Sequence, residues 1–148
     1  MEIYLLSVYY FRIEFSQVIW EKIFKLVKRL LVDMSMTVLH HGHIRLLKKA
    51  SELGSVIVGL TNDEDIVKFK GFKPYLTYEH RKEILLSISY VDKVIRSNWL
   101  IDEAFLDENN IDFLVHGDDN LNQVPTERLI IFPRTPGISS EQFRNFHQ

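Results

Sequence analysis

The sequence of 148 residues contains no cysteine. Disulfides, thiolate metal ligands and cysteine nucleophiles are therefore excluded, and a reducing cytoplasm is the expected compartment. An excess of one charge is also lacking, because 18 Lys and Arg residues stand against 20 Asp and Glu residues, for a net charge of -2. A general nucleic-acid binder usually carries a basic excess, so we predict no nucleic-acid partner. This balance still allows a local basic pocket for phosphates.

The chain also lacks a long uninterrupted apolar run. The uncharged run at 3–11 is too short to span a bilayer, and no basic segment precedes it as in a secretory signal. From 15 to 31, apolar residues recur at three- and four-residue steps, which predicts an amphipathic helix packed on the domain or on a subunit partner. Its polar face is basic, so a membrane-surface helix is the alternative. We assign 1–28 to an N-terminal extension and 29–148 to one domain.

After residue 28, short apolar or β-branched runs alternate with helical patterns. Strands are predicted at 30–34, 55–60, 93–96, 111–116 and 129–132. Helices are predicted at 42–53, with Gly54 at the C-cap side, at 77–90, at 100–109, and from Ser139 onward, where Gln142 has capping-box spacing. The polar stretch 61–76 is predicted to be a long loop, and long loops are commonly functional. The fold class is therefore α/β, with a Rossmann-like, doubly wound, mainly parallel five-stranded sheet and an additional N-terminal amphipathic helix.

Polar residues follow four of the predicted strands directly. These segments are 35–43, 61–63, 117–119 and 134–137. In open α/β sheets, ligands bind beyond the carboxyl ends of the strands. We therefore expect the four segments to converge on one crevice.

His40 and His43 lie three residues apart at a predicted strand-to-helix junction, so both can face one side of the first helical turn. Gly42 lets the backbone turn tightly and lets a ligand come close. A helix N-terminus suits a phosphate, and two imidazoles could donate hydrogen bonds to a reacting phosphoryl group. Two alternatives stay open at this point: surface histidines without a role, or a zinc or iron site that also uses Asp118 and Asp119.

Basic residues elsewhere could hold phosphates as well. Arg134 precedes a Pro-Gly turn and the Ser139 cap, and an arginine can clamp phosphate oxygens bidentately. Taken alone, an ordinary capped turn is the favoured interpretation of this segment. Three lysines at 68–73 could close over a polyphosphate, although a solvated surface is the commoner meaning of such a cluster. Arg81 could point into the same crevice or be a surface charge.

Four segments in order resemble the cytidylyltransferase family: Leu-His-His-Gly-His at 39–43, Tyr-Glu-His-Arg-Lys at 78–82, His-Gly-Asp-Asp at 116–119 and Arg-Thr-Pro-Gly-Ile-Ser-Ser at 134–140. The wider nucleotidylyltransferase superfamily, which includes adenylyltransferases, shares the HxGH motif. The RTxGIS run is narrower and favours the cytidylyl branch. The resemblance covers about 29–144. It implies a nucleotidylyltransferase domain at 29–148 that transfers CMP from CTP to a phosphorylated or phosphonylated small alcohol and releases pyrophosphate.

The same resemblance implies roles for individual residues. His40 and His43 would act on the transferring α-phosphoryl group, and Arg81 and Arg134 would complete the catalytic set at the phosphates. The residues implied in nucleotide binding are Ser35, Met36, Lys70, Trp99, Asp118, Thr135, Gly137, Ile138, Ser139 and Ser140. Mg²⁺ would come with the nucleotide, with no dedicated metal ligand in the protein. A homodimer is expected.

The chain departs from the family pattern just before the first histidine. Where the family usually has glycine and aspartate, this sequence has Met34 and Thr37. Loss of that carboxylate affects metal placement or the support of His40. Asp33 is nearby, but it precedes the motif and could face the other way. Two alternatives therefore stay open: an adenylyltransferase of the same superfamily, and a catalytically impaired nucleotide-binding domain.

Overall fold

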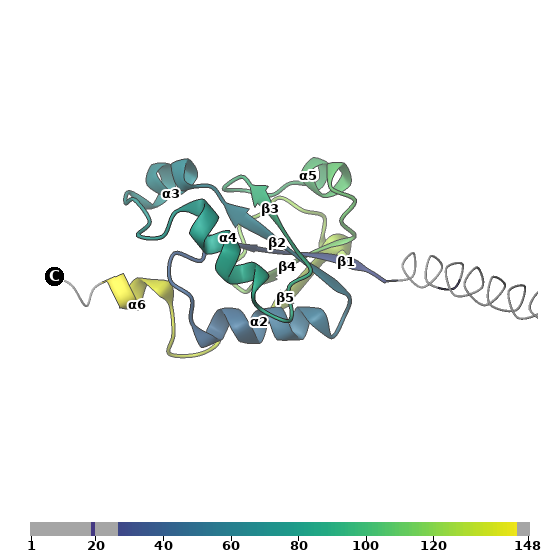
Figure 1. Ribbon diagram of the computed structural model, residues 1–148. Coiled ribbons are helices and arrows are strands. Elements are labelled where there is room, and N and C mark those ends of the chain that lie inside the picture. The colour runs from purple at the N-terminus through teal and green to yellow at the C-terminus, as the bar shows by residue number, and fades with distance from the viewer. Residues whose placement is uncertain (1–18, 20–26, 145–148) are drawn as a thin grey trace, which may run out of the picture.

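The computed structural model describes residue 19 and residues 27–144 of the chain. Five strands form one sheet in the order β3-β2-β1-β4-β5, and every neighbouring pair is parallel (Figure 1). The strands are β1 (Arg29–Met34), β2 (Ser55–Thr61), β3 (Lys93–Ser97), β4 (Phe113–Gly117) and β5 (Leu129–Phe132). The predicted doubly wound parallel sheet is confirmed. The chain steps outward from β1 to β2 and β3 on one side, and to β4 and β5 on the other, so the order reverses between β1 and β4.

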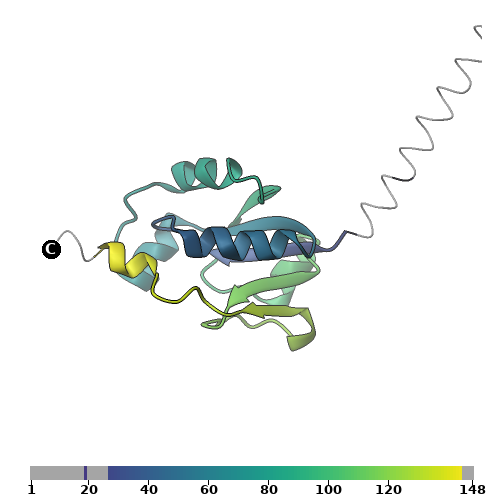
Figure 2. The ribbon, with the colours of Figure 1, turned by 90° about the horizontal axis from the view of Figure 1, so that it is seen from below.

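Helices cover both faces of this sheet (Figures 1 and 2). On one face, α2 (His41–Ser51) and α4 (Tyr78–Leu86) pack through Leu47 and Leu85 against alternate residues of the central strands. On the other face, α5 (Glu103–Glu108) packs Leu106 against Leu31 and Leu114. Two further helices, α3 (Asp63–Lys70) and α6 (Ser140–Arg144), lie at the edge where the strands end (Figure 1).

The central strand β1 lies in the core, and its last residues line the cavity described below. Five of its six residues are buried, as expected for a parallel strand covered on both faces. Leu30, Val32 and Met34 face α2 and α4, whereas Leu31 faces α5. By the two-residue period of a strand, Asp33 points to the same face as Leu31.

The prediction of a loop at 61–76 is wrong over its first half, where the helix α3 forms. The Asn62 side chain caps this helix by accepting a hydrogen bond of 2.8 Å from the Asp65 N–H. Acidic residues in the first turn and lysines in the last turn favour the helix dipole. The periodicity gave no signal because Ile66 is the only residue of α3 that is buried.

The predicted helix boundaries also shift. The helix expected to reach residue 90 ends at Leu86, and the one expected at 100–109 is α5, which begins after its cap Asp102. Gly54 does not cap α2, whose C-cap is Glu52. Instead, a Cβ at position 54 would collide with the carbonyl of Lys28, so glycine is required there by a close backbone approach.

The helix predicted at 15–31 falls mostly outside the described residues, and its last three positions belong to β1. Within the described part of the chain, no helix is both long enough and apolar enough to cross a membrane.

Candidate active site

An open cavity of about 600 Å³ lies beyond the carboxyl ends of β1 and β4, where the strand order reverses. This is the place where doubly wound folds bind their ligands. Residues from all four polar segments line it, so the expected convergence on one crevice occurs.

Most of the predicted site residues line this cavity: Ser35, His40, His43, Lys70, Trp99, Arg134, Thr135, Ile138, Ser139 and Ser140. Among the described residues, Met36, Arg81, Asp118 and Gly137 lie outside its lining. Met36 is buried with a left-handed φ of 40°, so its backbone rather than its side chain shapes the turn after β1. Gly137 has a φ of 74°, which glycine adopts without strain at the turn before α6.

The two motif histidines form the N-terminal cap of α2. The Nδ1 atom of His40 accepts a hydrogen bond of 3.1 Å from the Gly42 N–H, and Nδ1 of His43 accepts one of 3.3 Å from the His40 N–H. Each Nδ1 must therefore be unprotonated, which places the proton of a neutral ring on Nε2. The ring centroids are 3.9 Å apart. The cap thus leaves two Nε2–H donors for a ligand in the cavity.

Burial favours the neutral form of both rings. It lowers the pKa of His43 to about 3, and the neighbouring charges of His40, Lys70 and Arg134 act in the same direction. The pKa of His40 is also lowered, first by burial and then by His41 and Arg134. Neutral imidazoles at a helix N-terminus can donate hydrogen bonds to phosphoryl oxygens without themselves carrying charge.

Arg134 lines the same cavity as the two histidines. Its Nη1 atom donates to Oδ2 of Asp119 at 2.9 Å, and about half of the Arg134 side chain is exposed. Gly117 permits this pair, since a Cβ there would approach the Asp119 carboxylate and the Arg134 side chain. Arg134 is therefore held at the cavity by a surface ion pair that a phosphate can replace.

The last helix, α6, packs beside the histidines. The Ser140 hydroxyl donates to the carbonyl of Val38 at 3.2 Å, and the Phe143 ring stacks on His40 with centroids 6.3 Å apart. The Ser139 N–H donates to the Gln142 side chain at 3.2 Å, which confirms the expected capping spacing. These contacts bring the segment after Arg134 to the N-terminus of α2.

Lys70, at the end of α3, lies on the remaining side. Its Nζ atom is 2.6 Å from the Ser35 hydroxyl and 5.7 Å from the centroid of the Trp99 ring. Trp99 stacks on Phe69 with centroids 5.0 Å apart. Lys70 therefore belongs to the cavity through a helix that the sequence did not predict.

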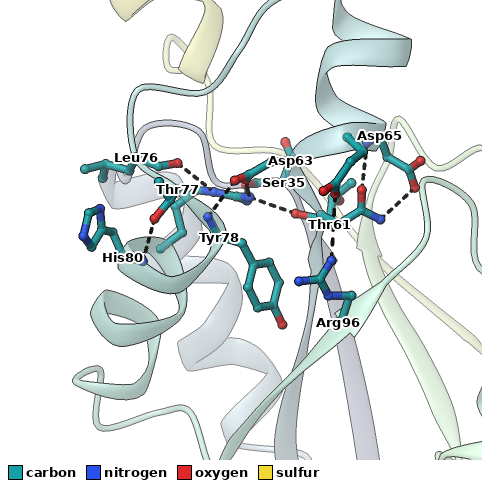
Figure 3. Close-up of polar contacts among 12 residues, drawn as sticks. Ser35, Thr61, Asp63, Asp65, Leu76, Thr77, Tyr78, His80 and Arg96 are labelled. Atoms are coloured by element: carbon teal, nitrogen blue, oxygen red, sulfur yellow. Dashed lines mark hydrogen bonds and ion pairs between the residues drawn. The ribbon is translucent and has the colours of Figure 1, made fainter.

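Arg81 does not point into the cavity as the resemblance implied. Its side chain is fully buried, and its guanidinium donates to the carbonyls of Leu76, Ser35 and Thr61 at 3.2, 2.6 and 3.0 Å and to Oδ1 of Asp63 at 2.5 Å. Figure 3 labels these four partners, Ser35, Thr61, Asp63 and Leu76, and marks polar contacts with dashed lines. Arg81 ties the ends of β1 and β2 to the segment before α4, and it acts on a ligand only through the residues it positions.

Asp33 is the site residue that sequence reasoning placed poorly. It lies at the end of β1, lines the cavity and is 9% exposed, so it does not face away. Its Oδ2 atom accepts a hydrogen bond of 3.1 Å from the Asn122 amide and lies 3.7 Å from Nε2 of His116. Burial raises the pKa of this carboxyl to about 6, against the opposing effects of His116, Asn122 and Lys70. The sequence signal that could have identified this site residue is an acidic residue within an otherwise apolar strand.

Thr37 stands where the resemblance to the family implies an aspartate. It is buried, and its hydroxyl finds no hydrogen-bond partner among the described residues. It also lies outside the cavity lining of that part of the chain. A carboxylate therefore reaches the cavity from Asp33 at the end of β1, but not from position 37.

No three His, Asp or Glu side chains within 27–144 gather closely enough to hold a metal ion, including the predicted set with Asp118 and Asp119. The cavity carboxylates are Asp33, Asp119 and Glu141. Mg²⁺ commonly keeps several waters and binds through one or two carboxylates plus substrate phosphates. This donor set suits Mg²⁺ that arrives on a nucleotide.

Comparison with known proteins identifies the class. A family model described as cytidylyltransferase-like matches residues 35–143, and the chain belongs to this family. The chain is 35% identical over 123 residues to a glycerol-3-phosphate cytidylyltransferase from Bacillus subtilis, covering 80% of this chain and 95% of that relative. It is a nucleotidyltransferase enzyme, as its relatives are named.

Two further similarities define how far the likeness extends. The chain is 36% identical over 93 residues to an ethanolamine-phosphate cytidylyltransferase from Dictyostelium discoideum, covering 62% of this chain and 26% of that longer relative. The crystal structure of a lipopolysaccharide core biosynthesis protein from Thermoplasma volcanium aligns with a TM-score of 0.62 at 18% identity, covering 74% of this chain and 98% of that one. The latter likeness supports the fold alone.

Proposed function

We propose that this protein transfers CMP from CTP to a phosphorylated or phosphonylated small alcohol and releases pyrophosphate. The observation that carries the proposal is the pairing of two neutral histidines at the N-terminus of α2 with Arg134 across the same cavity. A triphosphate in this cavity meets the hydrogen-bond donors of the histidines and the guanidinium of Arg134. The named relatives use cytidylyl transfer, which supports CTP as the nucleotide.

The reaction needs no covalent enzyme intermediate. An oxygen of the acceptor's phosphate or phosphonate attacks the α-phosphorus of CTP, and the new P–O bond forms as the bond to the bridging oxygen of the β-phosphate breaks. Pyrophosphate leaves with that electron pair, in line with the attacking oxygen. Catalysis then depends on alignment and on stabilising the charge of the transferring group.

The chain's own residues divide this work by position. The Nε2–H groups of His40 and His43 donate to oxygens on the α-phosphorus, where charge develops. Arg134 exchanges Asp119 for the phosphates of the leaving pyrophosphate. Lys70, beside Ser35 and Trp99, neutralises phosphate charge of the bound nucleotide. Mg²⁺, when bound with the nucleotide, neutralises part of the phosphate charge.

Calorimetry with CTP and ATP, each with Mg²⁺, tests this function on the full chain without knowledge of the acceptor. CTP binding with at least tenfold preference over ATP is expected. Preference for ATP would move the protein to the adenylyl branch of the superfamily. CTP binding without pyrophosphate release from any acceptor would favour a catalytically impaired nucleotide-binding domain.

We also propose a cytoplasmic homodimer, on the resemblance to the family. Light scattering of the full chain tests the oligomeric state, and a monomeric mass would contradict it. Contact of the basic N-terminal segment with a membrane surface stays a prediction, because that segment lies outside the described residues. Flotation of the full chain with anionic liposomes tests it, and protein left at the bottom of the gradient would oppose it.

A further inference from the structure

The cavity does not end at the histidines but continues along the helix α2. Gly42, Arg45, Leu46 and Lys49 all line it. Their spacing of three and four residues places them on one face of the helix. From Gly42 to Lys49 this face extends for about 10 Å along the helix axis. The histidines account only for the first turn, so the remaining length of the cavity wall has no role in the reaction described above.

The segment after β5 forms the other side of this part of the cavity. The Lys49 Nζ atom lies 5.3 Å from the centroid of the Phe132 ring, and a Cβ at Gly42 would lie 3.3 Å from Cγ2 of Ile138. From 132 to 138 the chain therefore runs antiparallel to α2, as the yellow segment beside that helix shows in Figure 2. We call the space between this segment and the lining face of α2 the α2 groove. Arg134 lies within the segment and lines the same cavity.

Arg45 and Lys49 give the α2 groove a positive charge that no acidic side chain balances. Both are exposed. Within residues 27–144, neither of them forms an ion pair with a carboxylate. Other arginines of the same part of the chain do have acidic partners, namely Arg81, Arg96, Arg128 and Arg134. The cations of the groove are therefore left to water or to a ligand.

The two cations are spaced for an anion with two phosphate groups. Phe132 packs against the core, so its ring is a fixed platform for the Lys49 ammonium through a cation–π contact. A guanidinium and an ammonium offer hydrogen-bond donors and no acceptors. Arg45 and Lys49 lie one helical turn apart, about 6 Å along the axis. Each cation can therefore meet one phosphate group of the same small ligand.

The proposed reaction releases such an anion beside this groove. Pyrophosphate leaves from the α-phosphorus at His40 and His43, where the charge of Arg134 also acts. Arg134 is two residues from Phe132, the platform of Lys49. The α2 groove is thus continuous with the place where pyrophosphate separates from the transferred group.

We propose that Arg45 and Lys49 form a second phosphate-binding site, which holds pyrophosphate after it has left the triphosphate site. Pyrophosphate in the α2 groove and CTP at the histidines and Arg134 can then be bound at the same time. The inference rests on the proposed function and adds a product site to it. Two acidic side chains line the same cavity, Asp119 and Glu141, and Asp119 is already paired with Arg134.

The test is calorimetric titration of the full chain with pyrophosphate, in the presence of saturating CTP and excess Mg²⁺ and without any acceptor. CTP then fills the triphosphate site, so pyrophosphate that still binds must use another one. The variant carries Arg45→Gln and Lys49→Gln together, which removes both charges at exposed positions. Lys48→Gln is the matched control, because Lys48 is an exposed lysine on the same helix outside the cavity lining of the described residues. Thermal denaturation verifies that each variant is folded.

The CTP-saturated wild type is expected to bind pyrophosphate. The double variant should weaken this binding by about tenfold or more, as the loss of charge-assisted hydrogen bonds implies. Its dissociation constant for CTP should stay within about threefold of the wild-type value, because the triphosphate contacts remain. Lys48→Gln should change neither constant by more than about threefold, since it removes the same charge from another face of α2.

Three results would overturn the inference and leave the proposed function intact. The CTP-saturated wild type would bind no pyrophosphate, Lys48→Gln would weaken pyrophosphate binding as much as the double variant does, or the double variant would lose CTP affinity to the same extent. The second result would indicate general charge attraction, and the third would place both side chains at the triphosphate.

A wild type that binds no CTP would instead contradict the proposed function. Pyrophosphate titration of the nucleotide-free chain then decides the inference separately. Weaker binding in the double variant alone would support the site in the α2 groove, and equal binding in all three proteins would overturn it.

Discussion

At the scale of single residues, the histidine cap of α2 performs two tasks with one pair of rings. Each Nδ1 atom satisfies a backbone N–H at the helix start, and this fixes the proton of each ring on Nε2. The structural cap therefore sets the tautomer that a phosphoryl group requires.

Removal of one donor should then affect turnover more than nucleotide binding. His43→Ala is expected to lower kcat by about 10²–10³, the usual effect of losing a transition-state donor. Pyrophosphate release at saturating CTP measures this. His80→Ala, an exposed histidine on α4, is the control and should retain wild-type turnover. Unchanged turnover in His43→Ala would remove the histidine from the mechanism.

The buried carboxyl group of Asp33 should lower the stability of the fold. Its pKa is raised from 3.8 to about 6 in the folded chain, chiefly by burial, so the folded state holds this proton more tightly than the unfolded state. Ionisation above pH 6 is therefore unfavourable to folding. A shift of about two pKa units corresponds to about 3 kcal/mol, which is an upper bound for the gain on neutralisation.

Asp33→Asn is accordingly expected to raise the free energy of unfolding by about 1–3 kcal/mol at pH 8. The gain should fade as the pH approaches 4, where the wild-type carboxyl is itself protonated. Urea denaturation at both pH values measures it, with Glu83→Gln, at an exposed position on α4, as the control. A variant less stable than the wild type at pH 8 would show that the buried charge is already compensated within the protein.

At the scale of elements, Arg81 joins four segments, two of which contribute residues to the cavity lining. Its guanidinium donates hydrogen bonds to acceptors at the end of β1, the end of β2, the start of α3 and the segment before α4. Breaking a buried pair typically costs about 3–5 kcal/mol, because the partner groups are left without donors. Lysine cannot replace the fork of donors that a guanidinium presents.

Both Arg81→Ala and Arg81→Lys should therefore lower the free energy of unfolding by about 3 kcal/mol or more. Lys82→Ala, at the next position of the same helix, should change it by less than about 0.5 kcal/mol. Chemical denaturation measures all three. Wild-type stability in Arg81→Lys would mean that the four acceptors do not depend on the fork geometry.

These elements also show what sequence alone can predict. The strands were predictable because parallel central strands are buried on both faces and appear as apolar runs such as Leu30–Val32 and Val56–Val58. The helix α3 was not, since only Ile66 is buried and its stability comes from capping and dipole terms. Capping and dipole interactions leave no apolar periodicity in the sequence, so the helix was not recognised.

The site divides in the same way. Residues adjacent in sequence, such as His40 and His43 or Arg134 and Thr135, line the cavity as expected because local geometry decides their position. Arg81 was predicted at the phosphates but lies buried outside the cavity lining, and Asp33 was not assigned to the site, because the surroundings of both residues come from distant segments. Asp33 meets Asn122 across 89 residues of chain, and Arg81 meets Ser35 across 46.

At the scale of the whole molecule, the candidate site residues lie at one edge of the sheet, where the strands end. Five parallel strands end at the same side, and the reversal of strand order between β1 and β4 leaves room for a ligand there. The histidines, Arg134, Lys70 and Asp33 reach the cavity from different elements. The donors and positive charges among them suit substrates whose reacting groups are phosphates.

Ligand binding should therefore stabilise the fold as a unit. CTP with Mg²⁺ at about 100 times its dissociation constant is expected to add about 2.7 kcal/mol to the free energy of unfolding. Thermal denaturation with and without the nucleotide measures the shift, and Arg134→Ala should reduce it by weakening CTP binding. An equal shift in that variant would place the triphosphate away from Arg134.

The central claim is that this cavity selects CTP for cytidylyl transfer. Calorimetric titration of the full chain with CTP and then ATP, both with Mg²⁺, tests it most directly. The account predicts that CTP binds at least tenfold more tightly than ATP and that this binding weakens in Arg134→Ala. Tighter binding of ATP, or binding of neither nucleotide, would contradict it.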